Sequence, residues 1–152
     1  MIIDCHSHTL CPAVNGAVAD VYRHDLVPYQ RDMSAESRAV DQAQGPVLGQ
    51  RFNDLPTRLA MMKDMRVDAQ GIAPAPGQQH YWAERDLLVA ISRQQNDHVA
   101  ALVGREPGRL FGLGTLPMSF VDAAIDEAGR AVEELGLKGF QIDSRVLDRE
   151  LS

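Results

Sequence analysis

Cysteine, aromatic residues and long apolar runs are all scarce in this sequence. Among 152 residues there are two cysteines, Cys5 and Cys11, and one tryptophan, and aromatic residues make up 5% of the chain. Two thiols give no disulfide framework, and the N-terminus lacks the charged and apolar regions of a signal peptide, so we expect a reducing, cytoplasmic location. No stretch approaches the roughly 18 apolar residues of a transmembrane helix, so we expect no membrane partner.

Positive charge is also in short supply. Lysine and arginine total 15 against 21 aspartate and glutamate residues, which gives a net charge of -6, and the chain has no run rich in Lys or Arg. Nucleic acids and anionic membranes attract basic surfaces, so we expect neither as a partner. The composition is that of an ordinary globular protein, and the length suits one domain with a sizeable core.

The strongest chemical signal lies in the first eight residues, MIIDCHSH. They predict a short apolar strand that ends in two histidines. Because alternate residues of a strand point to the same face, we expect Asp4, His6 and His8 on one face and Cys5 on the other. Neutral imidazole is a good ligand for divalent metals, so His6 and His8 are candidate metal ligands, with zinc as the expected ion. The alternative is two polar residues where a strand meets a loop.

The segment from residue 9 to about residue 53 is polar, contains several prolines and glycines and shows no sustained periodicity. We expect a long loop with one short helix around residues 34–44. A loop of this length in a compact domain is typically a lid or a binding loop. A disordered insertion is the alternative.

After residue 53 the chain alternates between helical and strand patterns. Asp54 predicts the N-cap of a first helix, and further helices are expected at residues 81–103 and from an N-cap at Ser119 to a stop at Gly136. Strands are expected at residues 67–73, 109–116 and 139–143. The last helix has an apolar face formed by Val121, Ala124, Ile125, Ala128, Val132 and Leu135.

This alternation predicts an α/β fold with a parallel sheet and right-handed crossovers. In such folds the chemistry sits at the carboxyl ends of the strands. His6 and His8 follow the first strand and therefore lie at that rim, which strengthens the metal-site interpretation.

Four stretches match a known pattern: residues 3–10 (IDCHSHTL), 80–83 (HYWA), 109–118 (RLFGLGTLPM) and 134–142 (ELGLKGFQI). They resemble the amidohydrolase superfamily and, within it, the branch of 2-amino-3-carboxymuconate-6-semialdehyde decarboxylase and related ring-acid decarboxylases. The resemblance is poor only across residues 9–53. It implies a (β/α)8 TIM-barrel domain, of which residues 1–152 would be the N-terminal half, with about the first four βα units.

The resemblance also implies what this half lacks. The remaining metal ligands of the family, a histidine after the fifth strand and an aspartate after the eighth, have no counterpart here, and neither has its acid–base histidine. We therefore assign no catalytic residue in this chain, and we expect the fragment to be inactive alone. For an intact chain the resemblance implies a homodimer. Lys138 precedes its strand, so we expect a site with one metal ion rather than two bridged by a lysine.

The function that the resemblance implies is metal-dependent decarboxylation of an aromatic or muconate-semialdehyde-type carboxylic acid. A metal-dependent hydrolase such as a lactonase or amidase on the same barrel is the alternative, and an inactive half barrel is a second one. A small-molecule carboxylate needs a cation, for which Arg51 is the candidate. Tyr81 and Trp82 are candidates to wall a planar substrate. The alternative for Arg51 is a solvated surface arginine, and the alternative for Tyr81 and Trp82 is packing in the core.

Overall fold

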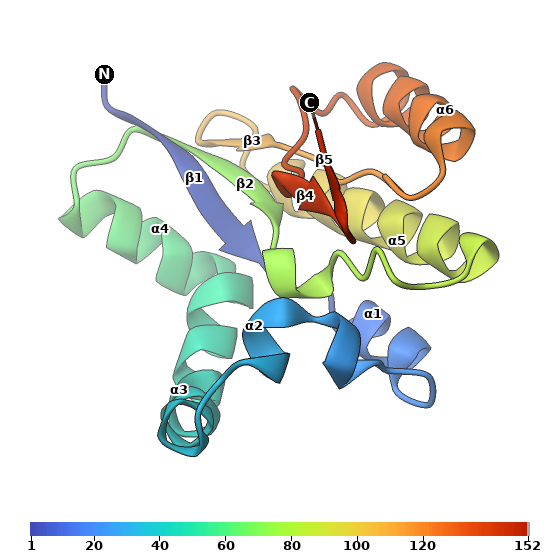
Figure 1. The fold of residues 1–152 in the computed structure, drawn as a ribbon. Coiled ribbons are helices and arrows are strands. Elements are labelled where there is room, and N and C mark those ends of the chain that lie inside the picture. Colours follow the sequence, from blue (N-terminus) through green and yellow to red (C-terminus); the bar gives the residue numbers. More distant parts are fainter. Residues whose placement is uncertain (152) are drawn as a thin grey trace.

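A three-stranded parallel sheet forms the centre of the molecule (Figure 1). The computed structural model describes residues 1–151, apart from the side chains of residues 28 and 29, and Ser152 of the expected domain lies outside the described residues. Strands β1 (Ile3–Thr9), β2 (Ala69–Pro74) and β3 (Leu110–Gly112) lie in the order β1-β2-β3. The expected fourth strand is reduced to one parallel bridge, between Gly114 and Phe140. The predicted α/β class with a parallel sheet is confirmed.

Helices connect the strands where the pattern after residue 53 predicts them. They are α4 (Leu55–Asp64), α5 (Arg85–Val103) and α6 (Val121–Glu133). Asp54 is the N-cap of α4 as expected, because its carboxylate accepts a hydrogen bond from the backbone N–H of Thr57 at 2.9 Å. The predicted N-cap of α6 is wrong, because Phe120 takes that position and the Ser119 hydroxyl donates to the carbonyl of Tyr81 instead. Gly136 adopts a φ of 69° just after α6, as its predicted role in ending the helix requires.

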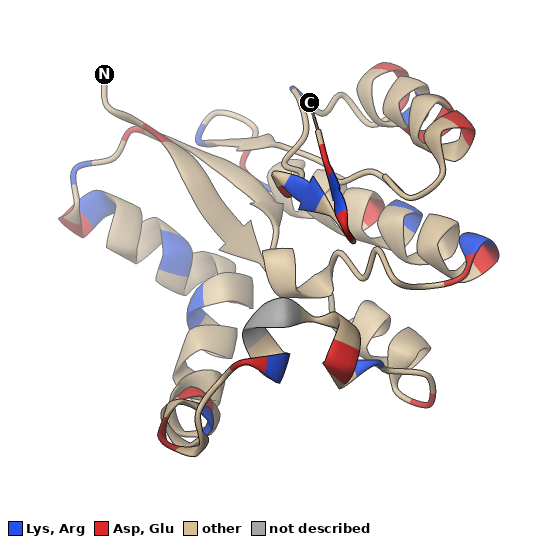
Figure 2. Ribbon diagram, in the orientation of Figure 1, with Lys and Arg blue, Asp and Glu red and all other residues tan. Residues whose placement is uncertain are grey.

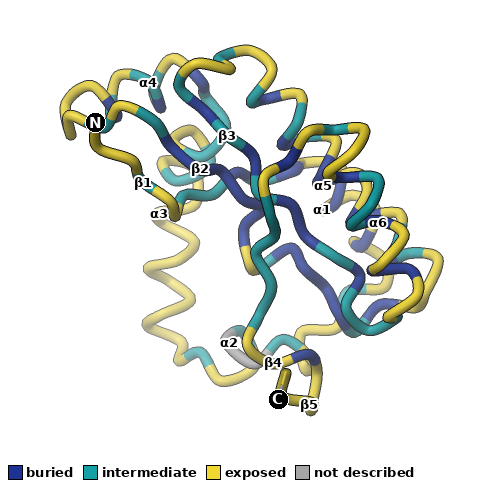
Figure 3. Tube along the Cα trace, turned by 90° about the horizontal axis from the view of Figure 1, so that it is seen from above, coloured by how far each residue is buried: buried dark blue, intermediate teal, exposed yellow. Residues whose placement is uncertain are grey.

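The expectation of a long loop across residues 9–53 is wrong, because most of this segment is helical. It contains α1 (Pro12–Val18), a 3-10 turn at His24–Leu26, α2 (Pro28–Arg31) and α3 (Ala35–Asn53). Ser34 caps α3 by accepting from the N–H of Ser37, but the helix continues well beyond residue 44 and through Pro46. α3 projects from the body of the molecule and is exposed along most of its length (Figure 3). Without a buried face it has no apolar periodicity, so the pattern could not predict its extent.

Clusters of apolar side chains hold the helices to the sheet, and Figure 3 shows β2 as the most deeply buried strand. One cluster joins α4, β2, α5 and β3 through Leu55, Met62, Ile72, Leu102 and Leu110. Another joins α1, α5 and the C-terminal hairpin, formed by β4 (Arg145–Val146) and β5 (Arg149–Glu150), and includes Val14, Val18, Leu88, Ile91 and Val146. A further 3-10 turn, Pro76–Gln78, follows β2.

The predicted apolar face of α6 is only partly buried: Ala124 is buried, but three of its large aliphatic residues are exposed. Val121, Ile125 and Val132 are 71%, 67% and 48% exposed, whereas the buried side of the helix carries Ala123, Ala124, Glu127 and Ala131. The expectation of an aliphatic core face is therefore wrong for Val121, Ile125 and Val132.

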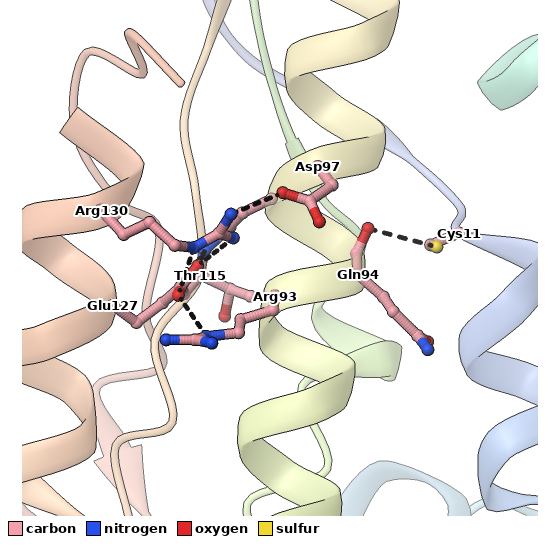
Figure 4. A network of polar contacts seen from close by, with 8 residues as sticks. Cys11, Arg93, Gln94, Asp97, Thr115, Glu127 and Arg130 are labelled. Carbon is pink, nitrogen blue, oxygen red and sulfur yellow. Dashed lines mark hydrogen bonds and ion pairs between the residues drawn. The ribbon is translucent and has the colours of Figure 1, made fainter. Parts of the chain in front are cut away.

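Polar contacts explain this orientation of α6 (Figure 4). The buried carboxylate of Glu127 accepts hydrogen bonds from Arg130 at 2.8 Å and from the Asn96 amide at 2.7 Å. Asn96 also accepts from the N–H of Thr115 and donates to its carbonyl. Arg130 in turn contacts Asp97 of α5 at 2.8 Å. A buried carboxylate must be paired, so this network turns Glu127 inward and the aliphatic side outward.

Charged residues of both signs are interspersed along the surface helices (Figure 2). Among the described residues, no helix is long and apolar enough to cross a membrane.

The packing around Gly112 gives a test of this fold. A Cβ added at Gly112 would lie 2.5 Å from Cδ2 of Leu137 and 2.9 Å from Cγ1 of Val99, and both side chains are buried. We expect Gly112→Ala to lower the free energy of unfolding by roughly 1–3 kcal/mol in a urea titration. Gly129→Ala is the control, because a Cβ there meets nothing within 4 Å and the helix should gain up to about 1 kcal/mol. Equal effects of the two substitutions would contradict the packing.

Candidate metal centre

The end of β1 brings the two predicted metal ligands together. The Nε2 atoms of His6 and His8 lie 3.1 Å apart, and the ring planes meet at 83°. Two nitrogen ligands that are each about 2.0–2.1 Å from one ion are themselves about 3 Å apart, so this donor pair fits a single divalent metal. Within residues 1–151 no group of three or more His, Cys, Asp or Glu side chains is arranged for a metal. The pair therefore offers two ligands of an incomplete set.

An irregularity in β1 separates Asp4 from this pair. The register against β2 shifts between Asp4 and Ser7, which interrupts the strict alternation that the sequence predicts. The Asp4 carboxylate accepts from the Gln70 amide at 2.8 Å and from the backbone N–H of His6 at 3.0 Å. The expectation that Asp4 shares a face with both imidazoles is thus not met, and Asp4 joins the polar contacts of β2.

Arg58 organises the strand end, and sequence reasoning missed it. Its side chain is only 6% exposed and donates to the carbonyls of His8 at 2.5 Å and Phe52 at 2.8 Å. It also donates to the Ser7 hydroxyl at 3.1 Å and to Oε1 of Gln70 at 2.7 Å. Burial lowers the pKa of Arg58, and the nearby Asp4 opposes that shift. Arg58 therefore fixes the backbone that carries the His8 imidazole.

A signal for Arg58 does exist in the sequence. Leu55, Arg58 and Met62 are the buried residues of α4, and their spacing of three and four residues is that of one helix face. An arginine on an otherwise apolar face is unusual unless its charge is satisfied inside the protein.

Arg51 lies in the same cavity as the histidines. The cavity has a volume of 310 Å³ and is lined by His6, Ser7, His8, Leu48, Arg51, Phe52, Arg58, Met61, Met65 and Gln70. Arg51 is exposed and belongs to the last turn of α3, rather than to a loop as expected. Two guanidinium groups line this cavity, an arrangement that suits a carboxylate ligand.

The electrostatics keep His8 in the form that binds a metal. Burial, and then the neighbouring His6, lower the pKa of His8 below its ordinary value of 6.5. A lowered pKa means that the imidazole stays neutral to lower pH, and only the neutral ring can coordinate an ion.

The other predicted substrate residues do not lie in this cavity. Tyr81 and Trp82 line a second cavity of 380 Å³, together with His80 and Asp143. The segment after Asp143 forms the β4–β5 hairpin. Lys138 is exposed, and its backbone N–H donates to the carbonyl of Gly112.

Comparisons with known proteins identify the family of this chain. A family model described as amidohydrolase matches residues 3–151. The 2-amino-3-carboxymuconate-6-semialdehyde decarboxylase of Dictyostelium discoideum is 39% identical over 85 residues, which are 56% of this chain and 24% of that protein. The gamma-resorcylate decarboxylase of Rhodococcus jostii is 34% identical over 104 residues, covering 62% of this chain and 31% of that protein. The chain thus spans about a quarter to a third of the curated relatives it matches.

Solved structures give the same result for the fold. The 5-carboxyvanillate decarboxylase of Sphingomonas paucimobilis superposes with a TM-score of 0.74 at 26% identity, covering 97% of this chain and 44% of that chain. The 5-carboxyvanillate decarboxylase of Novosphingobium aromaticivorans, complexed with manganese, superposes with a TM-score of 0.75 at 20% identity, covering 98% and 43%. The predicted fold class, part of a (β/α)8 barrel, and the predicted resemblance are confirmed.

The contacts of Arg58 predict a large cost for a conservative substitution. Arg58→Lys keeps the charge but cannot reach four acceptors from one planar group, so we expect a loss of roughly 2–4 kcal/mol in the free energy of unfolding. Arg51→Lys is the matched control, because Arg51 is exposed and should change stability by no more than about 0.5 kcal/mol. Chemical denaturation followed by circular dichroism measures both. Similar values for the two variants would refute the role of Arg58 described above.

Proposed function

We propose that this chain, which belongs to the amidohydrolase family, supplies His6 and His8 as two ligands of a divalent metal centre in a decarboxylase of ring or muconate-type carboxylic acids. The observation that carries the proposal is the 3.1 Å separation of the two Nε2 atoms at the carboxyl end of β1. Barrel enzymes place their chemistry at this rim. The decarboxylases named among the relatives and structural neighbours supply the reaction type.

The identity of the metal is part of the proposal. Two imidazoles suit zinc, which is the ion the sequence predicts. Manganese is bound in the 5-carboxyvanillate decarboxylase of N. aromaticivorans. Either ion, when bound, would act as a Lewis acid toward substrate oxygen atoms. We propose that the remaining ligands and the acid–base histidine belong to the portion of the barrel that the relatives carry beyond the matched segment.

The residues of this chain would then bind and orient the substrate. Arg51 can form a bidentate pair with the substrate carboxylate in the cavity beside His6 and His8. Arg58 holds the strand end in position through the carbonyl of His8. The neutral imidazole of His8 keeps its nitrogen lone pair free for coordination. A homodimeric assembly and a cytoplasmic location stay predictions from the resemblance and composition.

Metal binding tests the first part of the proposal. Calorimetric titration of the chain with Zn²⁺ and with Mn²⁺ should give about one ion per chain. His6→Ala and His8→Ala should each weaken binding at least about tenfold, equivalent to about 1.4 kcal/mol, because one of two ligands is lost. His24→Ala is the control, since the exposed His24 stacks edge-on against Tyr22 at 4.6 Å, outside the cavity. Stoichiometric binding that survives both substitutions would place the metal elsewhere.

The reaction itself tests the second part. When the remaining portion of the barrel is supplied, we expect metal-dependent carbon dioxide release from 2,6-dihydroxybenzoate or 5-carboxyvanillate, measured in parallel with hydrolysis of a lactone and an aryl amide. The chain alone should release none, because its ligand set is incomplete within residues 1–151. Arg51→Ala should raise KM at least about tenfold with a smaller change in kcat, because a charge-assisted pair to the carboxylate contributes about 1.5–3 kcal/mol. Hydrolysis without carbon dioxide release would favour the hydrolase. A completed, metal-loaded barrel that does neither would overturn the proposed function.

A further inference from the structure

The second cavity lies beyond the carboxyl end of β2 and is separate from the cavity of the metal pair. Its walls come from the turn after β2 and from the segment that leads into the C-terminal hairpin. They comprise Leu26, Val27, Pro76, Gly77, Gln79, His80, Tyr81, Trp82, Asp143, Ser144, Arg145 and Leu147. Its volume of 380 Å³ is ample for one substituted ring.

Buried polar atoms in this cavity lack partners. Oε1 of Gln79, both ring nitrogens of His80, the hydroxyl of Tyr81 and the indole nitrogen of Trp82 are buried and have no hydrogen-bond partner among the described residues. The Gln79 amide nitrogen donates to the carbonyl of Gln141 at 3.1 Å, so its oxygen is fixed as a free acceptor. An unsatisfied buried group costs about 1–3 kcal/mol, and five such atoms on residues that line one cavity are what a ligand or ordered water would satisfy.

The backbone holds these side chains in place at some cost. His80 has a φ of 45°, in the left-handed region that a residue with a side chain rarely adopts. The turn is nevertheless fixed, because the N–H of Ala83 donates to the carbonyl of His80 at 2.8 Å and Ser119 donates to the carbonyl of Tyr81. The rings of His80 and Trp82 stand 5.6 Å apart at 66°. Strain of this kind is typical of sites that are organised for a ligand.

The buried groups of the cavity are uncharged. Burial lowers the pKa of His80 to about 4, so its ring is neutral at pH 7 and offers one donor and one acceptor. Burial, together with the negative charge of Asp143, raises the pKa of Tyr81 to about 12, so its hydroxyl is also neutral. Arg145 is exposed, and one of its nitrogens lies 3.5 Å from the carbonyl of Asp148. The half-buried Asp143 is therefore the charge that a ligand inside the cavity would feel most.

Donors and acceptors balance among the unpartnered atoms. Trp82 and His80 each supply an N–H, while Gln79 and the second nitrogen of His80 supply acceptors. An anionic ring would bring acceptors only and would meet the carboxylate of Asp143. We propose that the second cavity binds an uncharged planar ring that carries both a hydrogen-bond donor and an acceptor, such as an aromatic amide or a phenol.

This site goes beyond the proposed function and does not require it. Where decarboxylation does occur, the carboxylate leaves as carbon dioxide and a proton takes its place on the ring carbon. The product is then a ring without that charge, which fits the second cavity better than the substrate does.

The single tryptophan of the chain makes the proposal directly testable, because Trp82 lines this cavity. Benzamide and benzoate have nearly the same shape, but only benzamide is uncharged and offers both donor and acceptor. We expect benzamide to cause a saturable change in Trp82 fluorescence and to bind at least about tenfold more tightly than benzoate, as one unfavourable contact with a partly buried charge implies. Benzoate binding as tight as that of benzamide, or no saturable signal with benzamide, would overturn the proposal.

Two substitutions test separately the charge of Asp143 and the ring nitrogens of His80. Asp143→Asn is nearly isosteric and removes the charge, so the preference for benzamide should fall to within about threefold. His80→Phe retains a ring without nitrogen atoms and should weaken benzamide at least about tenfold, whereas the control His24→Phe should leave it unchanged. An unaltered preference in the correctly folded Asp143→Asn variant would contradict the assigned selectivity. No metal is added, so failure here is distinguishable from failure of the metal proposal.

Discussion

A guanidinium group taken out of water loses strong hydration, and the fold around β1 depends on how that loss is offset for Arg58. Four acceptors, from β1, β2 and the end of α3, surround the group, and its helix, α4, packs on β2. The arrangement joins segments that are about fifty residues apart in sequence, since Ser7 and His8 lie that far from Arg58. The position of the His6–His8 pair depends on Arg58 as well as on β1, because the backbone fixes where a metal-binding side chain lies.

The two cavities differ in their charge, and this difference bears on the chemistry of the rim. The cavity beside His6 and His8 is lined by Arg51 and Arg58, whereas the cavity beside Trp82 is lined by buried neutral groups together with one residue of each charge, Asp143 and Arg145. The second cavity lies beyond the carboxyl end of β2, and the first lies beside β1, the strand that pairs with β2. A ring acid and the uncharged ring that it becomes would therefore meet different electrostatic surroundings in the two cavities.

Local signals in the sequence predict the structure correctly where the feature depends only on residues close together in the chain. Asp54 predicts its own helix cap, Gly136 predicts a left-handed residue, and His6 and His8 are brought together by their spacing. The failures come from interactions that the chain makes over long distances. The amphipathic pattern of α6 cannot show that Glu127 is held inward by Asn96, and the pattern of β1 cannot show the register shift that separates Asp4 from the histidines. α3 has no buried face, so it has no periodicity to detect. Arg58 was missed because arginine ordinarily indicates a solvated side of a helix.

The outward aliphatic side of α6 affects how this chain behaves in solution. Val121, Ile125 and Val132 present exposed aliphatic surface on one helix, while the charged groups of Glu127 and Arg130 are engaged against α5. Apolar surface exposed to water is unfavourable, and burial against any second apolar surface is favourable in proportion to the area covered. Self-association through this surface would add to the apparent stability by mass action and would make the midpoint of unfolding depend on protein concentration. Stability values for this chain are therefore meaningful only when the concentration is stated with them.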